Sequence, residues 1–278
     1  MNTEYKEKTI SENTTFEDVC FTSYDFTKTN LANVVFKNVN FSGCLFQKTN
    51  LDHTRFWCCF FDDCEFTSVN LSATYLGSWG GGLSGCVFQK CKFGKIINAS
   101  YFIDCTFDRC KLKATYFQTY LMRNIRFVGL IDDLSFQKFF TKEIYEYQQP
   151  GVVKKVEDKI RERVGSAFDR TEVVLHNIDF SACKTLFTSF ENCTVEGIIP
   201  PNDENELLVN NIDTVAKKVY DDIALCWPDA DTKSWALRCT ENYFNRTTEI
   251  ISFYELKHFE NEEFAEKLMH LFRKYSDS

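Results

Sequence analysis

The sequence predicts a β-solenoid that is joined to helical segments. Large apolar residues recur at every fifth position through the first part of the chain, and leucine replaces phenylalanine at every fourth of these positions. From about residue 134 this period gives way to helical patterns, and it later returns briefly. A period of five fits neither an α-helix, which repeats every 3.6 residues, nor a strand, which repeats every two. The predicted fold class is therefore a mainly β solenoid with added α-helices.

The apolar repeat defines one short strand in each five-residue unit. The residue two positions before each apolar centre is small or β-branched, except in the unit that contains Tyr24. We expect both residues to point inward, so that four units close a coil of about twenty residues and coils stack about 4.8 Å apart. The centres in this phase are Phe16, Phe21, Phe26, Leu31, Phe36, Phe41, Phe46, Leu51, Phe56, Phe61, Phe66, Leu71 and Leu76. Leu31, Leu51 and Leu71 each follow an asparagine and predict a leucine ladder on one face.

A glycine-rich break follows Leu76. The next centre is Leu83, so residues 77–82 carry a two-residue insertion, whose three consecutive glycines would supply positive φ angles at a bulged corner. The period then resumes with a one-residue deletion near Ile97. The later centres are Phe88, Phe93, Ile97, Phe102, Phe107, Leu112, Phe117, Met122 and Phe127. We assign residues 14–132 to this solenoid, after a flexible N-terminus of residues 1–13.

The rest of the chain divides into three segments. Residues 133–170 are expected to form a helical insertion, because Ser135 to Ala167 reads as a helix, a Pro-Gly turn and a second helix. The five-residue phase returns in residues 171–200, which we expect to add one more coil to the solenoid. Residues 201–278 are predicted to be a helical C-terminal domain, which could cap the open end of the solenoid.

The repeat resembles that of the pentapeptide-repeat family, whose consensus is A-(D/N)-L-x-x. The segments TNLAN, TNLDH, VNLSA and VNFSG carry the resemblance, which covers roughly half of the chain. It implies a right-handed quadrilateral β-helix. The sequence departs from the consensus by favouring Phe at the centre and Cys, Thr or Val, in place of Ala, two positions earlier.

The sequence gives no constellation typical of an enzyme, and we predict no catalytic residue, metal site or cofactor. Nine of the thirteen cysteines occupy the inward position two before a centre, where a small buried hydrophobe is expected. Cys226 and Cys239 lie outside the repeat, but no histidine falls in a recognisable nucleophile motif with either. Phosphate-binding, dinucleotide-binding and zinc-protease motifs do not occur in the sequence.

Outward apolar residues give the predicted binding surface. Val35, Tyr75 and Tyr116 precede centres on one face, while Phe60, Tyr101 and Leu121 precede centres on the next. Together with Trp79 in the glycine-rich corner, they form a predicted apolar stripe. Such a patch contacts either the helical part of the same chain or a partner protein.

These observations favour a non-enzymatic protein-binding solenoid, and members of the family that it resembles include bacterial effectors delivered into host cells. We expect a protein partner, without direct binding to nucleic acid or membrane. We also expect a cytoplasmic location, or export without a cleaved signal peptide, since the first residues are polar.

Two alternatives remain. Some members of that family protect gyrase by mimicking DNA, but mimicry needs an acidic solenoid. Residues 14–127 carry nine acidic and twelve basic side chains, a net +3, although the whole chain carries −8. The second alternative is an effector whose activity lies in the helical C-terminal part, where Cys226 and Cys239 would be tested first.

Overall fold

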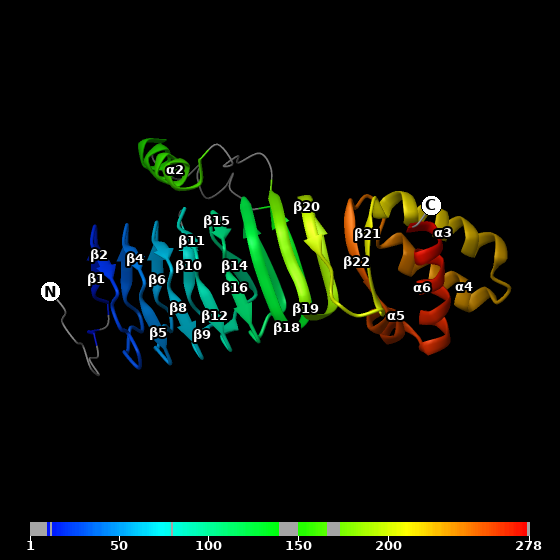
Figure 1. Ribbon diagram of the computed structural model, residues 1–278, viewed down its shortest axis with the longest axis horizontal. Coiled ribbons are helices and arrows are strands. Elements are labelled where there is room, and N and C mark those ends of the chain that lie inside the picture. The colour runs from blue at the N-terminus through cyan, green and yellow to red at the C-terminus, as the bar shows by residue number, and fades with distance from the viewer. Residues whose placement is uncertain (1–9, 12, 79, 139–149, 166–172, 277–278) are drawn as a thin grey trace.

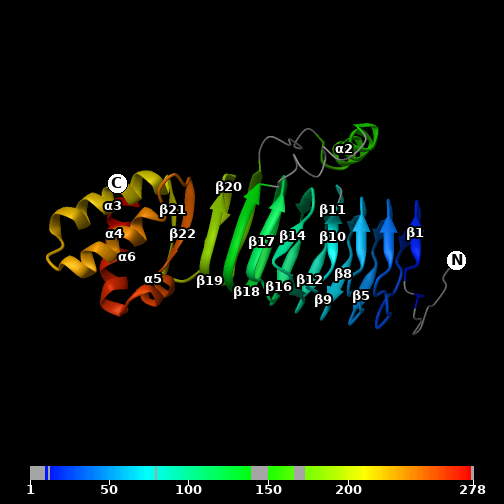
Figure 2. The same cartoon turned by 180° about the vertical axis from the view of Figure 1, so that it is seen from behind.

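The computed structural model describes residues 10–11, 13–78, 80–138, 150–165 and 173–276. Figure 1 shows a rod of stacked strands that ends in a helical domain at its C-terminal end, with one helix lying along its side. The rod is a β-solenoid of about eight turns, which confirms the predicted fold class. Figure 2 shows the same order from behind.

Parallel strands stack on the faces of this rod, and we number the faces in chain order. The first face contains β1 (Thr15–Glu17), β3 (Val35–Lys37), β6 (Arg55–Trp57), β10 (Tyr75–Ser78), β14 (Ile96–Asn98) and β17 (Lys113–Thr119). The second contains β2 (Cys20–Thr22), β4 (Asn40–Ser42), β7 (Phe60–Asp62), β11 (Gly82–Ser84) and β15 (Tyr101–Ile103). The third contains β5 (Leu45–Gln47), β8 (Glu65–Thr67), β12 (Val87–Gln89) and β16 (Thr106–Asp108). The fourth contains β9 (Asn70–Leu71) and β13 (Lys92–Phe93).

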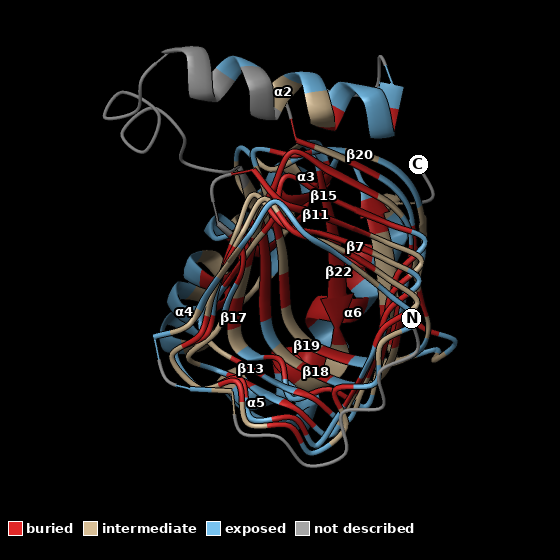
Figure 3. Ribbon diagram, turned by 90° about the vertical axis from the view of Figure 1, so that its left-hand side faces the viewer, coloured by how far each residue is buried: buried red, intermediate tan, exposed pale blue. Residues whose placement is uncertain are grey.

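The predicted centres lie in register inside the solenoid. Phe36 pairs with Phe56 on the first face, and Phe41 pairs with Phe61 on the second. The rings of Phe36 and Phe56 stack with centroids 5.0 Å apart and planes 6° from parallel. Repetition of this contact along the first three faces gives a core of aromatic ladders beside the leucine residues of the fourth face. Figure 3, which views the rod from its end, marks the buried residues along these faces.

The inward residues two positions before each centre form a second column in the core. Their hydrogen bonds explain why this chain uses Cys and Thr where the consensus of the family that it resembles has Ala. The Thr54 hydroxyl donates to the Leu31 carbonyl oxygen at 2.8 Å, and the Cys59 thiol donates to the Phe36 carbonyl oxygen at 3.4 Å. Both side chains are therefore small enough for the core and also satisfy a carbonyl group of the preceding coil. None of the thirteen cysteines, all of which are described, forms a disulfide.

The later coils are built from longer strands that bend around the corners. These are β18 (Leu121–Lys138), β19 (Val174–Glu191) and β20 (Thr194–Ile199). β18 pairs in parallel with β15, β16 and β17 in turn, and β19 then pairs with β18 and β20.

The predicted start of the helical insertion is wrong. Residues 135–138 belong to β18, because Phe136 continues the first-face ladder between Phe117 and Phe190, at ring centroid distances of 5.6 and 5.2 Å. Burial in this ladder overrides the local helical pattern. The first predicted helix otherwise falls on residues 139–149, outside the described residues. The second helix is α2 (Pro150–Val164), which begins at the proline assigned to a turn.

The glycine-rich break combines two backbone requirements. Gly80 has a φ of 103°, as predicted for this corner. Gly81 and Gly82 are instead required by close approach, because a Cβ would lie 2.3 Å from the Cys59 carbonyl oxygen or 2.2 Å from the Tyr101 ring. At these two positions glycine therefore serves close packing, whereas at Gly80 it serves the positive φ angle.

The C-terminal domain contains α3 (Ile212–Cys226), α4 (Ala230–Glu241), α5 (Phe253–Phe259) and α6 (Glu262–Ser276). It also contains an antiparallel pair, β21 (Glu206–Asn210) and β22 (Thr248–Ser252), so the prediction of a purely helical domain is wrong. The helices enclose a separate core that includes Val219, Ile223 and Leu268. Ile250 and Leu208 of the antiparallel pair pack against the solenoid core, so this pair covers the last coil.

Candidate interaction surfaces

Helix α2 covers the second-face half of the predicted apolar stripe. Phe60, Tyr101 and Leu121 are buried, and they pack with Ile160 and Val164 of the helix. These three outward residues therefore belong to internal packing. They are not a free surface for a partner in this structure.

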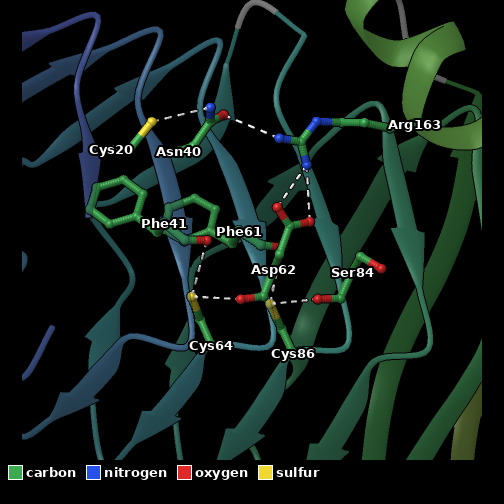
Figure 4. A network of polar contacts seen from close by, with 9 residues as sticks. All are labelled: Cys20, Asn40, Phe41, Phe61, Asp62, Cys64, Ser84, Cys86 and Arg163. Atoms are coloured by element: carbon green, nitrogen blue, oxygen red, sulfur yellow. Dashed lines mark hydrogen bonds and ion pairs between the residues drawn. The ribbon is translucent and has the colours of Figure 1, made fainter. Parts of the chain in front are cut away.

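Arg163 anchors the helix to the solenoid, as Figure 4 shows. Its Nη1 donates to Asp62 Oδ1 and Oδ2 at 2.9 and 2.8 Å, and its Nη2 donates to Asn40 Oδ1 at 3.2 Å. The guanidinium also lies 4.2 Å from the centre of the Phe60 ring. Charge-assisted hydrogen bonds and stacking make this a specific contact between α2 and the solenoid.

The first-face half of the stripe lies beside a groove that the chain leaves open. Tyr75 is 55% exposed, whereas Val35 and Tyr116 are partly buried, and Trp79 lies outside the described residues. Among the described residues, β10 pairs only with β6, and β14 pairs only with β17. The backbone pairing of strands along the first face is therefore interrupted between β10 and β14. The interruption coincides with the insertion and the deletion found in the sequence.

The interruption creates an apolar groove of about 240 Å³. Its lining consists of Leu71, Thr74, Tyr75, Leu76, Phe93, Gly94, Ile96, Ile97, Asn98 and Gln118. Ile96 is 56% exposed and was missed as a candidate from the sequence, although the one-residue deletion beside it was a usable signal.

Exposed lysines lie beside residues that line this groove. Lys92, Lys95, Lys111 and Lys113 are exposed on or next to the fourth face. Lys92 and Lys111 are bridge partners on successive coils, so two like charges are stacked on this face. Asp132 pairs with Lys113 at 2.8 Å. The surface next to the groove is therefore suited to acidic groups.

The last coil meets the C-terminal domain through buried carboxylates. The backbone N–H of Thr185 donates to Glu206 Oε1 at 2.8 Å, and that of Phe187 donates to Glu255 Oε2 at 3.2 Å. The two glutamates thus provide the acceptors that a further coil would supply. Burial raises the pKa of both side chains, that of Glu255 to about 7.

The two cysteines outside the repeat lie in different environments. Cys226 is exposed at the end of α3, whereas Cys239 is buried in α4, and burial raises its pKa to about 11. Across the described ranges, no group of three or more His, Cys, Asp or Glu side chains is placed to hold a metal ion. None of the described helices is both long enough and apolar enough to cross a bilayer.

Comparison with known families matches the N-terminal coils. A family model for pentapeptide repeats matches residues 12–47 and 44–77, with eight copies of the repeat. No curated protein matches the chain. The second-face ladder that begins in the matched residues continues from β7 through β11, β15 and β18 to β19, which extends the same architecture beyond the match. The chain is therefore a pentapeptide-repeat protein.

Proposed function

We propose that this protein is a non-enzymatic binding protein whose groove between β10 and β14 takes an acidic segment of another protein. The observation that carries the proposal is the break in the first-face ladder, where Tyr75 and Ile96 remain more than half exposed. Most of the other described aromatic residues of the solenoid are stacked in its core or covered by α2, and Trp57 and Tyr116 are partly buried.

The proposed partner segment follows from the chemistry of the groove. The volume of about 240 Å³ is suited to one bulky apolar side chain, which would contact Leu76, Phe93 and Ile97. Lysines 92, 95 and 111 would attract carboxylates that flank this anchor. An acidic segment with a single Phe, Trp or Leu anchor matches both features.

A reducing compartment suits this function. Thirteen cysteines without a disulfide among them, most of them in the solenoid core, are typical of proteins kept in a cytosol. The proposal therefore places the protein in a bacterial cytoplasm, or in a host cytosol if it is an exported effector.

The two alternatives have less support. A DNA mimic would present acidic groups along the solenoid, whereas Lys90, Lys92, Arg109 and Lys111 are exposed on adjacent coils. An activity in the C-terminal part would need an activated group. Cys239 is buried, and burial raises its thiol pKa, which disfavours a nucleophilic role.

Selection of short displayed peptides on the full chain tests the proposal. We expect the native protein to enrich acidic peptides with one large apolar residue, and the double variant Tyr75→Ser/Ile96→Ser to lose them. Val87→Ser, which changes an exposed apolar residue on the third face, is the matched control and should retain them. Enrichment of basic peptides, or equal enrichment by the groove variant, would contradict the proposal.

A further inference from the structure

A second cavity lies where the solenoid meets the C-terminal domain. It has a volume of about 290 Å³. β18 and β19 contribute Ser135 and Ser189 to its wall, while Arg246, Glu249 and Glu255 come from the C-terminal domain. The cavity is separate from the apolar groove between β10 and β14, because the two share no lining residue.

The charges around this cavity are unbalanced. Its lining includes four carboxyl groups, those of Asp133, Glu191, Glu249 and Glu255, and a single guanidinium, that of Arg246. Arg246 Nη1 donates to Glu249 Oε2 at 2.8 Å, so this one cation is already engaged. The wall therefore carries an excess of negative charge when its carboxyl groups are ionised, which disfavours an anionic ligand.

Two buried polar atoms in the wall lack partners. The Glu249 side chain is only 2% exposed, and its Oε1 has no hydrogen-bond partner among the described residues. Within the same part of the chain, Thr188 Oγ1 is also buried without a partner. Unsatisfied buried groups of this kind cost free energy, which a ligand with N–H donors would recover.

Aromatic rings complete the wall. Phe187 and Phe259 lie edge to face with centroids 5.8 Å apart, and both line the cavity. The Tyr243 hydroxyl lies 3.4 Å from Glu255 Oε1. Rings beside carboxylates are a favourable setting for an organic cation, since both interact with positive charge.

We propose that this cavity binds the guanidinium or primary ammonium head of an organic cation. The unpartnered Oε1 of Glu249 and the Thr188 hydroxyl oxygen would accept its N–H groups, while Asp133 and Glu191 would balance its charge. A quaternary ammonium would interact with the rings, but it has no N–H groups to donate. The cation can be a free amine or guanidine, or an arginine or lysine side chain of a partner protein.

Binding should strengthen as the pH rises through about 7 to 8. Burial, together with the neighbouring Glu255 and Glu191, raises the pKa of Glu249 to about 8, while Arg246 opposes this shift. The pKa of Glu255 is raised by burial to about 7. Because a cation favours the ionised carboxylates, its binding should release protons at neutral pH.

Agmatine, which carries one guanidinium and one primary ammonium, is a suitable first probe. We would measure its binding to the full chain by ligand-observed NMR and calorimetry, with tetramethylammonium as the cation without N–H donors. A ligand of this size is expected to bind with a Kd on the order of 1 mM or below. Affinity should fall about tenfold or more in Glu249→Gln, since that variant replaces the charged acceptor.

Two further variants keep the test decisive. Asp133→Asn changes an exposed residue of the wall, should fold normally, and should also weaken binding. Glu266→Gln, an exposed change on α6, should leave the affinity unchanged. Binding that none of the wall variants weakens, or equal binding of tetramethylammonium, would overturn the proposal.

A short blocked peptide with one central arginine distinguishes the two sources of the cation. Binding of both agmatine and the peptide supports a site open to free cations. Binding of the peptide alone assigns the site to a side chain of a partner protein. If neither probe binds at about pH 8.5, where the guanidinium is still fully charged, the proposal is wrong.

Discussion

At the scale of single residues, the solenoid depends on side chains that fill space and hydrogen-bond at the same time. Cys59 and Thr54 both donate to carbonyl groups of the preceding coil while lying in an apolar interior. Burial raises the pKa of the Cys59 and Cys193 thiols to about 12, so both remain protonated at neutral pH. These thiols are therefore structural groups and poor nucleophiles.

Thiol reactivity should separate the exposed cysteines from the buried ones. With iodoacetamide at about pH 7.5, Cys20 and Cys226 should react in the folded protein, because both are exposed. Cys59 and Cys193 should react only after denaturation. Mass spectrometry of digested samples measures each site, and modification of Cys59 as fast as Cys226 would contradict this assignment.

Removal of one ring from a ladder should be costly. Phe61 stacks on Phe41 with centroids 4.8 Å apart and is fully buried. Phe61→Ala should lower the free energy of unfolding by about 3–5 kcal/mol, measured by urea denaturation. Phe61→Leu is the matched control and should cost about 1 kcal/mol, because it retains most of the apolar volume. Equal losses for the two variants would argue against the packing role of the ring.

At the scale of elements, α2 is held on the solenoid by few contacts. Only Ile160 and Val164 are buried on the described part of the helix, and its polar contacts with the solenoid include those of Arg163 with Asp62 and of Lys159 with Asn38. Arg163→Ala should therefore increase hydrogen exchange across α2, while exchange in β4 and β7 remains slow. Glu162→Ala, on an exposed position of the same helix, is the control. Unchanged exchange in Arg163→Ala would show that Arg163 is not needed to hold α2 on the solenoid.

The junction with the C-terminal domain should respond to pH. Glu249 and Glu255 bind protons more tightly when folded, since burial raises their pKa values to about 8 and about 7. Their stabilising contribution is complete below the ordinary glutamate pKa and is lost as the pH rises through these values. Each pH unit over which such a group holds its proton only in the folded state changes stability by about 1.4 kcal/mol, so the free energy of unfolding should fall by roughly 5 kcal/mol between about pH 5.5 and 8.5. Glu249→Gln should make this dependence shallower, and an unchanged slope would exclude Glu249 as its origin.

The short strands of the solenoid could be predicted from the sequence, because the central residue of each five-residue unit occupies the same buried environment. Phe36, Phe41 and Phe46 all occupy the positions that the five-residue period predicts. The antiparallel pair of β21 and β22 could not be predicted, because its strands lie far apart in the chain. The cavity was missed for the same reason, since Glu191 and Glu249 carry no shared local motif.

The apolar stripe was only partly predictable. Outward positions such as Phe60 and Tyr75 look alike in sequence, but α2 covers the first and leaves the second exposed. That difference depends on where a distant helix docks, which no periodicity encodes. The groove beside Ile96 was detectable only as a deletion in the repeat.

At the scale of the whole molecule, the C-terminal domain closes one end of the rod. Without residues 203–278, the backbone N–H groups of Thr185 and Phe187 would lose the carboxylates of Glu206 and Glu255. A chain that ends at residue 202 should therefore associate through its open edge. Light scattering after gel filtration measures this. The full chain is the control, and a truncated protein that stays monomeric at high concentration would contradict the capping role.

The segment inserted between β18 and β19 has a consequence for how a solenoid of this kind can accept additional sequence. The chain leaves the coil after Lys138 and rejoins it at Val174, yet Phe136 still stacks on Phe190 across this excursion. One corner of the solenoid therefore accommodates an inserted segment, while β18 and β19 on either side of it keep their pairing register. Because the entropic cost of a longer loop grows only by about 0.6 kcal/mol per doubling, this corner is a site where a whole module could be grafted. A pentapeptide solenoid is thus a scaffold that can gain side branches as well as additional coils.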